Sequence, residues 1–287
     1  AVSAQTVGKW QRLELSFPNA TYSGNPFELT FDVAFTHTQS GEKLTLPGYY
    51  DGSDTWKAGF MPTKTGEWTY LTSSPDSDLS GKTGSITAVE SGLPGMLKAD
   101  PQNPRKWKFT DGGYVVPIAL RLDEFSSGSF SDADLISAAD FLKNDVKGHL
   151  FDYPLLSVGN ANLATEAFEN NDWTTSRFNI TWWERLERRM EILAERGLGY
   201  HMMFYTDTPG TPPWPEQSDT EKLLMRYAVA RLAGYPVLWF NTGIDITEYR
   251  SCAWQEWYAQ YIRSLDPYGH PVGSRSAIKK CSSVPSA

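Results

Sequence analysis

The spacing of apolar residues changes once along the chain, near residue 92, and this change limits the possible folds more than any other feature. Before it, apolar and polar residues alternate, most clearly over residues 27–38. A period of two is typical of β-strands that bury one face. After it, short apolar runs alternate with longer segments of helical spacing. We therefore expect a β domain over residues 1–92 and a domain of βα units over residues 93–287.

The first of these domains has the rhythm of a β-sandwich. In the strand predicted over residues 27–38, one face consists of apolar side chains that we expect to be buried: Phe27, Leu29, Phe31, Val33 and Phe35. Shorter strands are predicted over residues 10–17, 44–46, 56–60, 68–72 and 86–88, most of them separated by turns that contain glycine. Roughly seven strands in about 90 residues are typical of an immunoglobulin-like sandwich. The Cys…Trp…Cys pattern of antibody domains is absent from this sequence.

Helix-breaking residues between 91 and 107 mark the border, and βα units follow it. Strands are predicted over residues 114–122, 149–156, 199–205 and 236–245, with a further strand over 270–275. Helices are predicted to open at Ser131, at Thr181-Trp182-Trp183-Glu184 and at Ser218, and a last one to span residues 251–265. The order predicts a parallel sheet, and because no glycine-rich dinucleotide or phosphate motif occurs, a (β/α) barrel is favoured. Four clear units are half of the eight that a barrel needs, so we expect it to be incomplete.

Charge and composition exclude some classes of partner. The chain has 26 Lys and Arg against 34 Asp and Glu, a net charge of −8. Such a balance argues against nucleic acid or an anionic membrane as a partner, and we expect no transmembrane helix because long apolar stretches are missing. Residues 1–5 resemble the remainder of a cleaved signal peptide, which predicts a secreted or periplasmic protein. The sequence does not decide whether Cys252 and Cys281 form a disulfide.

Polar residues follow every predicted parallel strand, which is where a barrel has its active site. An acidic or amide group at each strand end suits sugar processing, because these groups bind hydroxyls and paired carboxyls perform acid–base work. The alternative for each residue is that it only caps the next helix. The predicted substrate-binding residues are Arg121, Asp123, Glu124, Asn160, Tyr205, Asp207, Trp214 and Asn241.

Asp245 is the preferred catalytic acid, with Glu248 as its competitor. Asp245 ends an apolar strand at the open face of the predicted barrel, and Glu248 follows three residues later. The histidines have no metal-like spacing and no His-Glu-x-x-His occurs, so neither a metal nor another cofactor is expected. His201 is interpreted as a packing residue. Four tryptophans beside the loops are candidates for stacking on sugars: Trp173, Trp182, Trp183 and Trp214.

Several motifs resemble a known family of enzymes. They are Asn25-Pro26-Phe27, Gly48-Tyr49-Tyr50-Asp51-Gly52, Thr55-Trp56-Lys57, Phe60-Met61-Pro62 and Gly66-Glu67-Trp68-Thr69-Tyr70. Over about residues 7–90 they resemble the N-terminal β-sandwich that precedes the barrel in many bacterial multidomain glycoside hydrolases. The connection over residues 97–113 resembles the entry to that barrel. The resemblance implies an acid/base carboxylate at the end of the fourth strand, which means Asp245 or Glu248. The usual Asn-Glu pair is replaced here by Gly243-Ile244-Asp245-Ile246-Thr247-Glu248.

These observations predict a secreted glycoside hydrolase that acts on a polysaccharide or oligosaccharide. The alternatives are a polysaccharide lyase, for which Arg121 and Arg250 would bind acidic sugars, and a non-catalytic carbohydrate-binding or scaffold protein. The expected partner is a carbohydrate substrate. An oligomer or a second chain that completes the barrel is the other expected partner.

Overall fold

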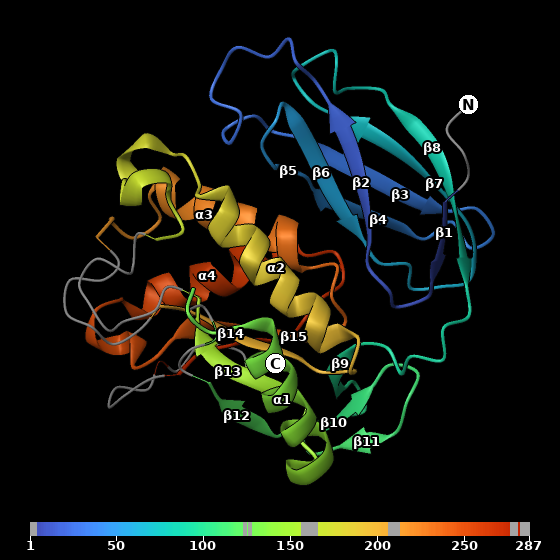
Figure 1. The fold of residues 1–287 in the computed structure, drawn as a ribbon, viewed down its shortest axis with the longest axis vertical. Coiled ribbons are helices and arrows are strands. Elements are labelled where there is room, and N and C mark those ends of the chain that lie inside the picture. Colours follow the sequence, from blue (N-terminus) through green and yellow to red (C-terminus); the bar gives the residue numbers. More distant parts are fainter. Residues whose placement is uncertain are drawn as a thin grey trace.

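The computed structural model describes residues 5–122, 125, 128–155, 166–205, 213–275 and 281. Residues 5–89 form two β-sheets that lie beside a mixed α/β part (Figure 1). The strands are β1 (Gln5–Gly8), β2 (Leu13–Pro18), β3 (Asp32–His37), β4 (Lys43–Pro47), β5 (Tyr49–Tyr50), β6 (Thr55–Phe60), β7 (Gly66–Ser73) and β8 (Thr83–Val89). One sheet has the order β1-β8-β7-β3-β4 and the other β2-β6-β5. The β1–β8 pair is parallel, and the other pairs are antiparallel.

Aromatic side chains fill the space between these two sheets. Phe35 of β3 stacks on Phe60 of β6 with 4.0 Å between the ring centroids, and Phe60 meets Trp68 of β7 at 5.2 Å. Phe35, Phe60 and Trp68 are completely buried. The predicted buried face is confirmed at Phe27, Phe31, Val33 and Phe35, whereas Leu29 is only partly buried. Whether the strand connections are immunoglobulin-like stays a prediction.

Two strand boundaries in this part differ from the sequence prediction. The long strand begins at Asp32 rather than at residue 27, because the Asn25 side chain accepts a hydrogen bond from the amide of Phe27 (3.3 Å) and forms a turn. Trp10 has a φ of 67°, so the strand predicted over residues 10–17 begins only at Leu13, as β2, and β1 before it was not predicted. Both errors come from local turns within an alternating pattern.

A small antiparallel sheet follows the β domain. It contains β9 (Leu97–Asp100), β10 (Asn103–Phe109) and β11 (Tyr114–Val115). Leu97 and Phe109 pack with Leu150 and Val237, which lie at the amino ends of two parallel strands. This small sheet therefore covers the amino end of the parallel sheet, whereas the predicted active site lies at its carboxyl end.

The parallel sheet has the order β12-β13-β14-β15-β16. Its strands are β12 (Ala119–Arg121), β13 (Leu150–Pro154), β14 (Gly199–Tyr205), β15 (Leu238–Gly243) and β16 (Val272–Gly273). The four predicted βα units and the further strand are thus present, but the predicted strand over 114–122 is divided at Pro117, which has no amide proton for a sheet. Within the described part of the chain the sheet does not close into a barrel, and β12 and β16 are its edges.

The helices begin where side chains satisfy their first amide groups. They are α1 (Asp132–Phe141), α2 (Ile180–Ala194), α3 (Asp219–Leu232) and α4 (Cys252–Leu265), with the π-helix η1 (Leu142–Val146) and the 3₁₀ turns η3 (Glu169–Asn171), η4 (Trp173–Thr175) and η5 (Ile246–Glu248). The predicted caps Ser131 and Ser218 are confirmed, and Ser251 caps α4. The prediction that α2 opens at Thr181 is wrong by one or two residues, because Asn179 accepts the hydrogen bond from the Trp182 amide.

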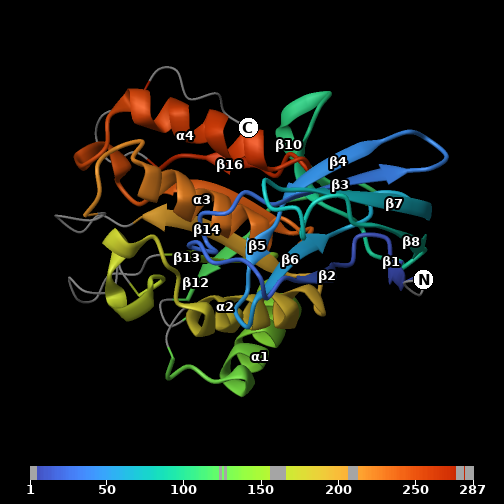
Figure 2. The same ribbon diagram turned by 90° about the horizontal axis from the view of Figure 1, so that it is seen from above.

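Helices α2 and α3 lie between the parallel sheet and the β domain (Figures 1 and 2). Arg226 of α3 donates hydrogen bonds to the carbonyl of Phe31 and to the carboxylate of Asp32. Within the described residues, no helix is both long enough and apolar enough to cross a membrane.

Candidate functional site

A row of polar side chains crosses the parallel sheet on one face. Register places Asp152 of β13 beside His201 of β14, and His201 beside Trp239 of β15. Neighbouring residues of parallel strands point to the same side. Nδ1 of His201 lies 3.0 Å from Oδ1 of Asp152, and the imidazole ring is 4.8 Å from the Trp239 ring. Asp152 and His201 are partly exposed, so this face carries a polar patch.

The patch continues toward the carboxyl ends of the strands. Asn241, two residues beyond Trp239, accepts a hydrogen bond from the Gly243 amide at Oδ1 (3.0 Å). Gly273 of β16 leaves room for both side chains, because a β-carbon there would lie 3.0 Å from Nε1 of Trp239 and 3.3 Å from Nδ2 of Asn241. Arg121 is beside Asp152 in the register, and its guanidinium lies over the Tyr153 ring.

Two buried nitrogen atoms of this patch have no hydrogen-bond partner among the described residues. They are Nε2 of His201 and Nε1 of Trp239. Buried polar groups are nearly always hydrogen-bonded, because an unpaired one costs ~1–3 kcal/mol. The patch is therefore suited to a partner with hydroxyl or other polar groups.

The two carboxyl groups predicted to be catalytic follow β15. Asp245 has a left-handed backbone with a φ of 47° and precedes η5. Its side chain is partly exposed, and that of Glu248 is exposed. The amide of Glu248 donates to the carbonyl of Asp245 (2.9 Å), and the amide of Ile246 donates to the carbonyl of Arg275 (3.1 Å). The turn therefore holds both residues at the carboxyl end of the sheet, and their catalytic roles stay predictions.

Tyr205 and Trp214 are used in packing rather than exposed. The Tyr205 hydroxyl donates to Glu221 (2.8 Å), and Nε1 of Trp214 lies 3.4 Å from the same hydroxyl. Tyr205 and Trp214 are 1% and 2% exposed. Trp182 and Trp183 are also buried in α2, and Trp183 donates to the carbonyl of Ala167. The expectation that Trp182, Trp183 and Trp214 offer open faces to a sugar is therefore corrected, because helix packing covers these rings.

Several predicted site residues lie outside the described residues: Asp123, Glu124, Asn160 and Asp207. Conversely, Asp152 and His201 were not predicted as site residues. Aspartate is uncommon in the interior of strands. The presence of Asp152 in a predicted strand could therefore have indicated a functional residue. Among the described residues, no cluster of three or more His, Cys, Asp or Glu residues could hold a metal ion.

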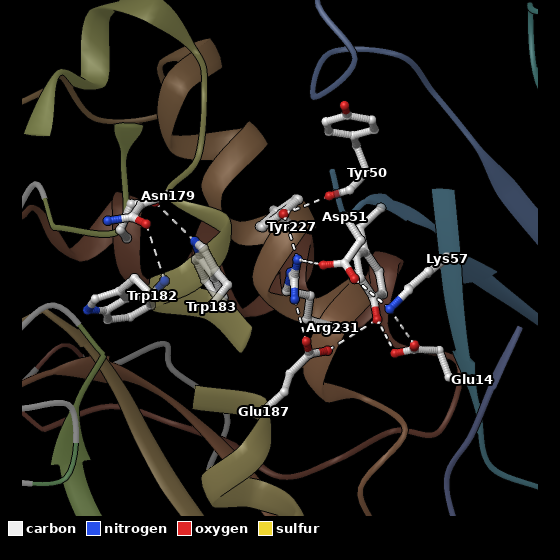
Figure 3. Close-up of polar contacts among 12 residues, drawn as sticks. Glu14, Tyr50, Asp51, Lys57, Asn179, Trp182, Trp183, Glu187, Tyr227 and Arg231 are labelled. Carbon is white, nitrogen blue, oxygen red and sulfur yellow. Dashed lines mark hydrogen bonds and ion pairs between the residues drawn. The ribbon is translucent and has the colours of Figure 1, made fainter. Parts of the chain in front are cut away.

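A second polar cluster lies between the β domain and helices α2 and α3 (Figure 3). Arg231 of α3 forms ion pairs with Asp51, which follows β5, and with Glu187 of α2. Glu187 also pairs with Arg12 (3.0 Å), and Lys57 bridges Asp51 (2.6 Å) and Glu14 (2.7 Å). Burial raises the pKa of the Tyr49 hydroxyl. All charges of this cluster are mutually compensated, which indicates a structural junction rather than a binding site.

Comparison with known proteins identifies the fold more clearly than the family. Residues 6–75 match a family model described as a domain of unknown function, DUF5060. No curated protein matches the chain. A presumed glycoside hydrolase from Bacteroides vulgatus has a similar structure, with a TM-score of 0.82 and 22% sequence identity over 95% of this chain. This similarity shows a shared fold.

Two further structures from Bacteroides cellulosilyticus align much less closely. A family 39 glycoside hydrolase has a TM-score of 0.33 at 12% identity, covering 94% of this chain and 49% of that protein. A family 2 member has a TM-score of 0.40 at 9% identity, covering 96% of this chain and 34% of that protein. The chain spans 56% of the Bacteroides vulgatus protein, and thus about half of its length.

Proposed function

We propose that this chain is part of a glycoside hydrolase that cleaves a polysaccharide or oligosaccharide. The observation that carries the proposal is the polar row Asp152–His201, continued by Asn241, on one face of a parallel sheet. Carboxylate, imidazole and amide groups suit the hydroxyls of a sugar. The fold similarity to a presumed glycoside hydrolase supports the same class.

In this proposal Asp245 is the general acid, and Glu248 is the alternative. A general acid protonates the oxygen of the leaving sugar while the glycosidic bond breaks. Asp245 is the better candidate because its side chain is partly shielded and its backbone is fixed by a left-handed turn, whereas Glu248 is exposed. Arg121, Asp152, His201 and Asn241 would bind the substrate. The β domain would serve as a non-catalytic support.

Two further parts of the proposal concern location and assembly. Cys252 and Cys281 form a disulfide, which supports a secreted or periplasmic location because such bonds persist in oxidising compartments. The edges β12 and β16 would pair with further βα units that complete the barrel, supplied by an oligomer, by a second chain or by more of the same protein. Light scattering of these 287 residues tests the first source, and a mass of one chain alone would contradict an oligomer.

Release of reducing ends from a panel of neutral and acidic polysaccharides tests the proposed function. A glycoside hydrolase produces new reducing ends without ultraviolet absorbance. An unsaturated product that absorbs in the ultraviolet would instead identify a lyase. Binding without any new reducing ends would identify a carbohydrate-binding or scaffold protein and would contradict the proposal.

A further inference from the structure

Glu221, in the first turn of α3, is completely buried between β14, α4 and the segment after β15. The sequence predicts only a helix cap at this position. In the structure Ser218 caps α3 by accepting a hydrogen bond from the Glu221 amide (3.3 Å). This cap involves only the backbone of Glu221, and its carboxylate makes separate contacts.

Four donors surround the Glu221 carboxylate. The Tyr205 hydroxyl donates to Oε1 (2.8 Å), and Arg250 reaches the same oxygen from 3.5 Å. Nε1 of Trp254 (2.9 Å) and the amide of Gln217 (2.6 Å) donate to Oε2. Burial raises the pKa of Glu221 above its ordinary value, although the hydrogen bonds from Trp254 and Gln217 lower it in part. Each of the four partners can donate to the carboxylate, so both of its oxygens are hydrogen-bonded.

Arg250 connects this carboxylate to the proposed catalytic turn. It also donates to the carbonyl of Trp214 (3.0 Å), and its guanidinium lies over the rings of Tyr205 and Trp254. Its backbone amide donates to the carbonyl of Ile246 (2.9 Å). Asp245 and Glu248 lie in the same short segment, residues 244–250. A displacement of Arg250 would therefore displace the turn that carries both carboxyl groups.

We propose that Glu221 is a positioning residue of the proposed hydrolase. Its carboxylate holds the turn over residues 244–250 in place against the end of β14, through Arg250 and Tyr205. The catalytic part of this inference rests on the proposed function. The competing explanation is that Glu221 only completes the amino end of α3.

The variant Glu221→Gln separates these explanations. The oxygen of the new amide can still face Gln217 and Trp254, whose N–H groups can only donate hydrogen bonds. The amide nitrogen then faces the Tyr205 hydroxyl, which can accept a hydrogen bond, and Arg250, which cannot. The substitution therefore selectively removes the link to Arg250. Glu191→Gln, at an exposed residue of α2, is the matched control.

Hydrogen exchange of the backbone amides is the first measurement. Glu221→Gln is expected to accelerate exchange over residues 244–250 about ten- to a hundredfold, as the loss of a charged hydrogen bond predicts, with no change in the control. Arg250→Gln breaks the same contact from the other side and serves if Glu221→Gln does not fold. The double variant should add little to either single variant. Faster exchange confined to residues 219–222 would overturn the proposal in favour of a helix cap.

Kinetics is the second measurement. On a substrate that the wild type hydrolyses, Glu221→Gln is expected to lower kcat about ten- to a hundredfold with KM changed less than about twofold, because the acid is misplaced rather than removed. An unchanged kcat would overturn the positioning role. If the wild type hydrolyses no polysaccharide, the proposed function fails, while the exchange experiment still decides whether Glu221 holds the turn.

Discussion

Arg231 of α3 pairs with Asp51 of the β domain and with Glu187 of α2, although its own side chain is completely buried. One guanidinium thus joins three elements that are far apart in the sequence. The ring of Tyr49 lies 4.5 Å from the guanidinium carbon, and Tyr227 donates its hydroxyl to the carbonyl of Tyr50. Burial by itself would lower the pKa of Arg231, but Tyr227, Glu187, Tyr49 and Asp51 raise it above its usual value, so its charge is permanent.

Replacing Arg231 by methionine should destabilise the whole chain. The substitution leaves Asp51 and Glu187 buried with fewer cations, and breaking a buried pair on one side typically costs ~3–5 kcal/mol. Urea unfolding measures this loss. Arg188→Met is the control, because Arg188 pairs with Asp132 and Glu191 on an exposed helix face and should lose less than ~1 kcal/mol. Equal stability of the two variants would contradict a structural role for the junction.

Low pH should destabilise the folded state through the protonation of Asp266. Burial by itself would raise the pKa of Asp266, but His270 and the amides of Tyr268 and His270 outweigh it, and the pKa is lowered. The stabilisation is complete at pH values above the pKa of an aspartate in the unfolded chain, about 3.9. It is lost as the pH falls through the lower pKa that Asp266 has in the folded state. Urea unfolding between about pH 2 and pH 6 should show this decline. Asp266→Asn should flatten it, whereas Asp140→Asn on the surface of α1 should not.

Reduction of the disulfide should lower the thermal midpoint. Cys252 and Cys281 are bonded across a sequence separation of 29 residues. In the chain-entropy model a loop of this length contributes about 3–4 kcal/mol. Thermal unfolding with and without a reductant measures the effect, and Cys252→Ser/Cys281→Ser should behave like the reduced wild type in both conditions. A reductant-sensitive midpoint in that double variant would show that another process is responsible.

Asp245→Asn should reduce hydrolysis without unfolding the chain. The amide keeps the size of the side chain but has no proton to give, so kcat should fall by about 10²–10⁴ on a poor leaving group. A substrate with an acidic leaving group should lose much less, because it needs little protonation. Glu248→Gln is the comparison. If it alone loses activity, the acid is Glu248, and if neither variant does, the acid lies elsewhere.

Hydrophobic spacing was sufficient to predict most elements of the fold. It predicts β2, β3, β4, β6, β7 and β8 and the alternation of strands with helices α1 to α4, but not β1 or β5. The errors occur where a single residue changes the backbone locally, as Asn25 does before β3 and Pro117 does before β12. The parallel pairing of β1 with β8 was not predicted, because the sequence of a strand does not show which strand it will pair with.

The candidate site was predicted less completely than the fold. Strand ends can be found in a sequence, and Asn241 and Asp245 were found in this way. Asp152 and His201 lie in strand interiors, and they become neighbours only through the register between β13 and β14. Likewise, the capping pattern at Ser218 accounts for the position of Glu221 but not for the direction of its carboxylate. Those relationships are tertiary, and no local pattern encodes them.

The parallel pairing of β1 with β8 affects how the β domain would respond to mechanical force. Gln5 pairs with Ile86 and Gly8 with Val89, so the chain enters at one end of this pair and leaves at the other. Tension between residue 5 and residue 89 would pull the two strands past each other along their length. All hydrogen bonds of the pair would then bear the load together instead of opening one by one. A domain held at these two points would resist being pulled apart, because no single hydrogen bond of the pair can break before the others.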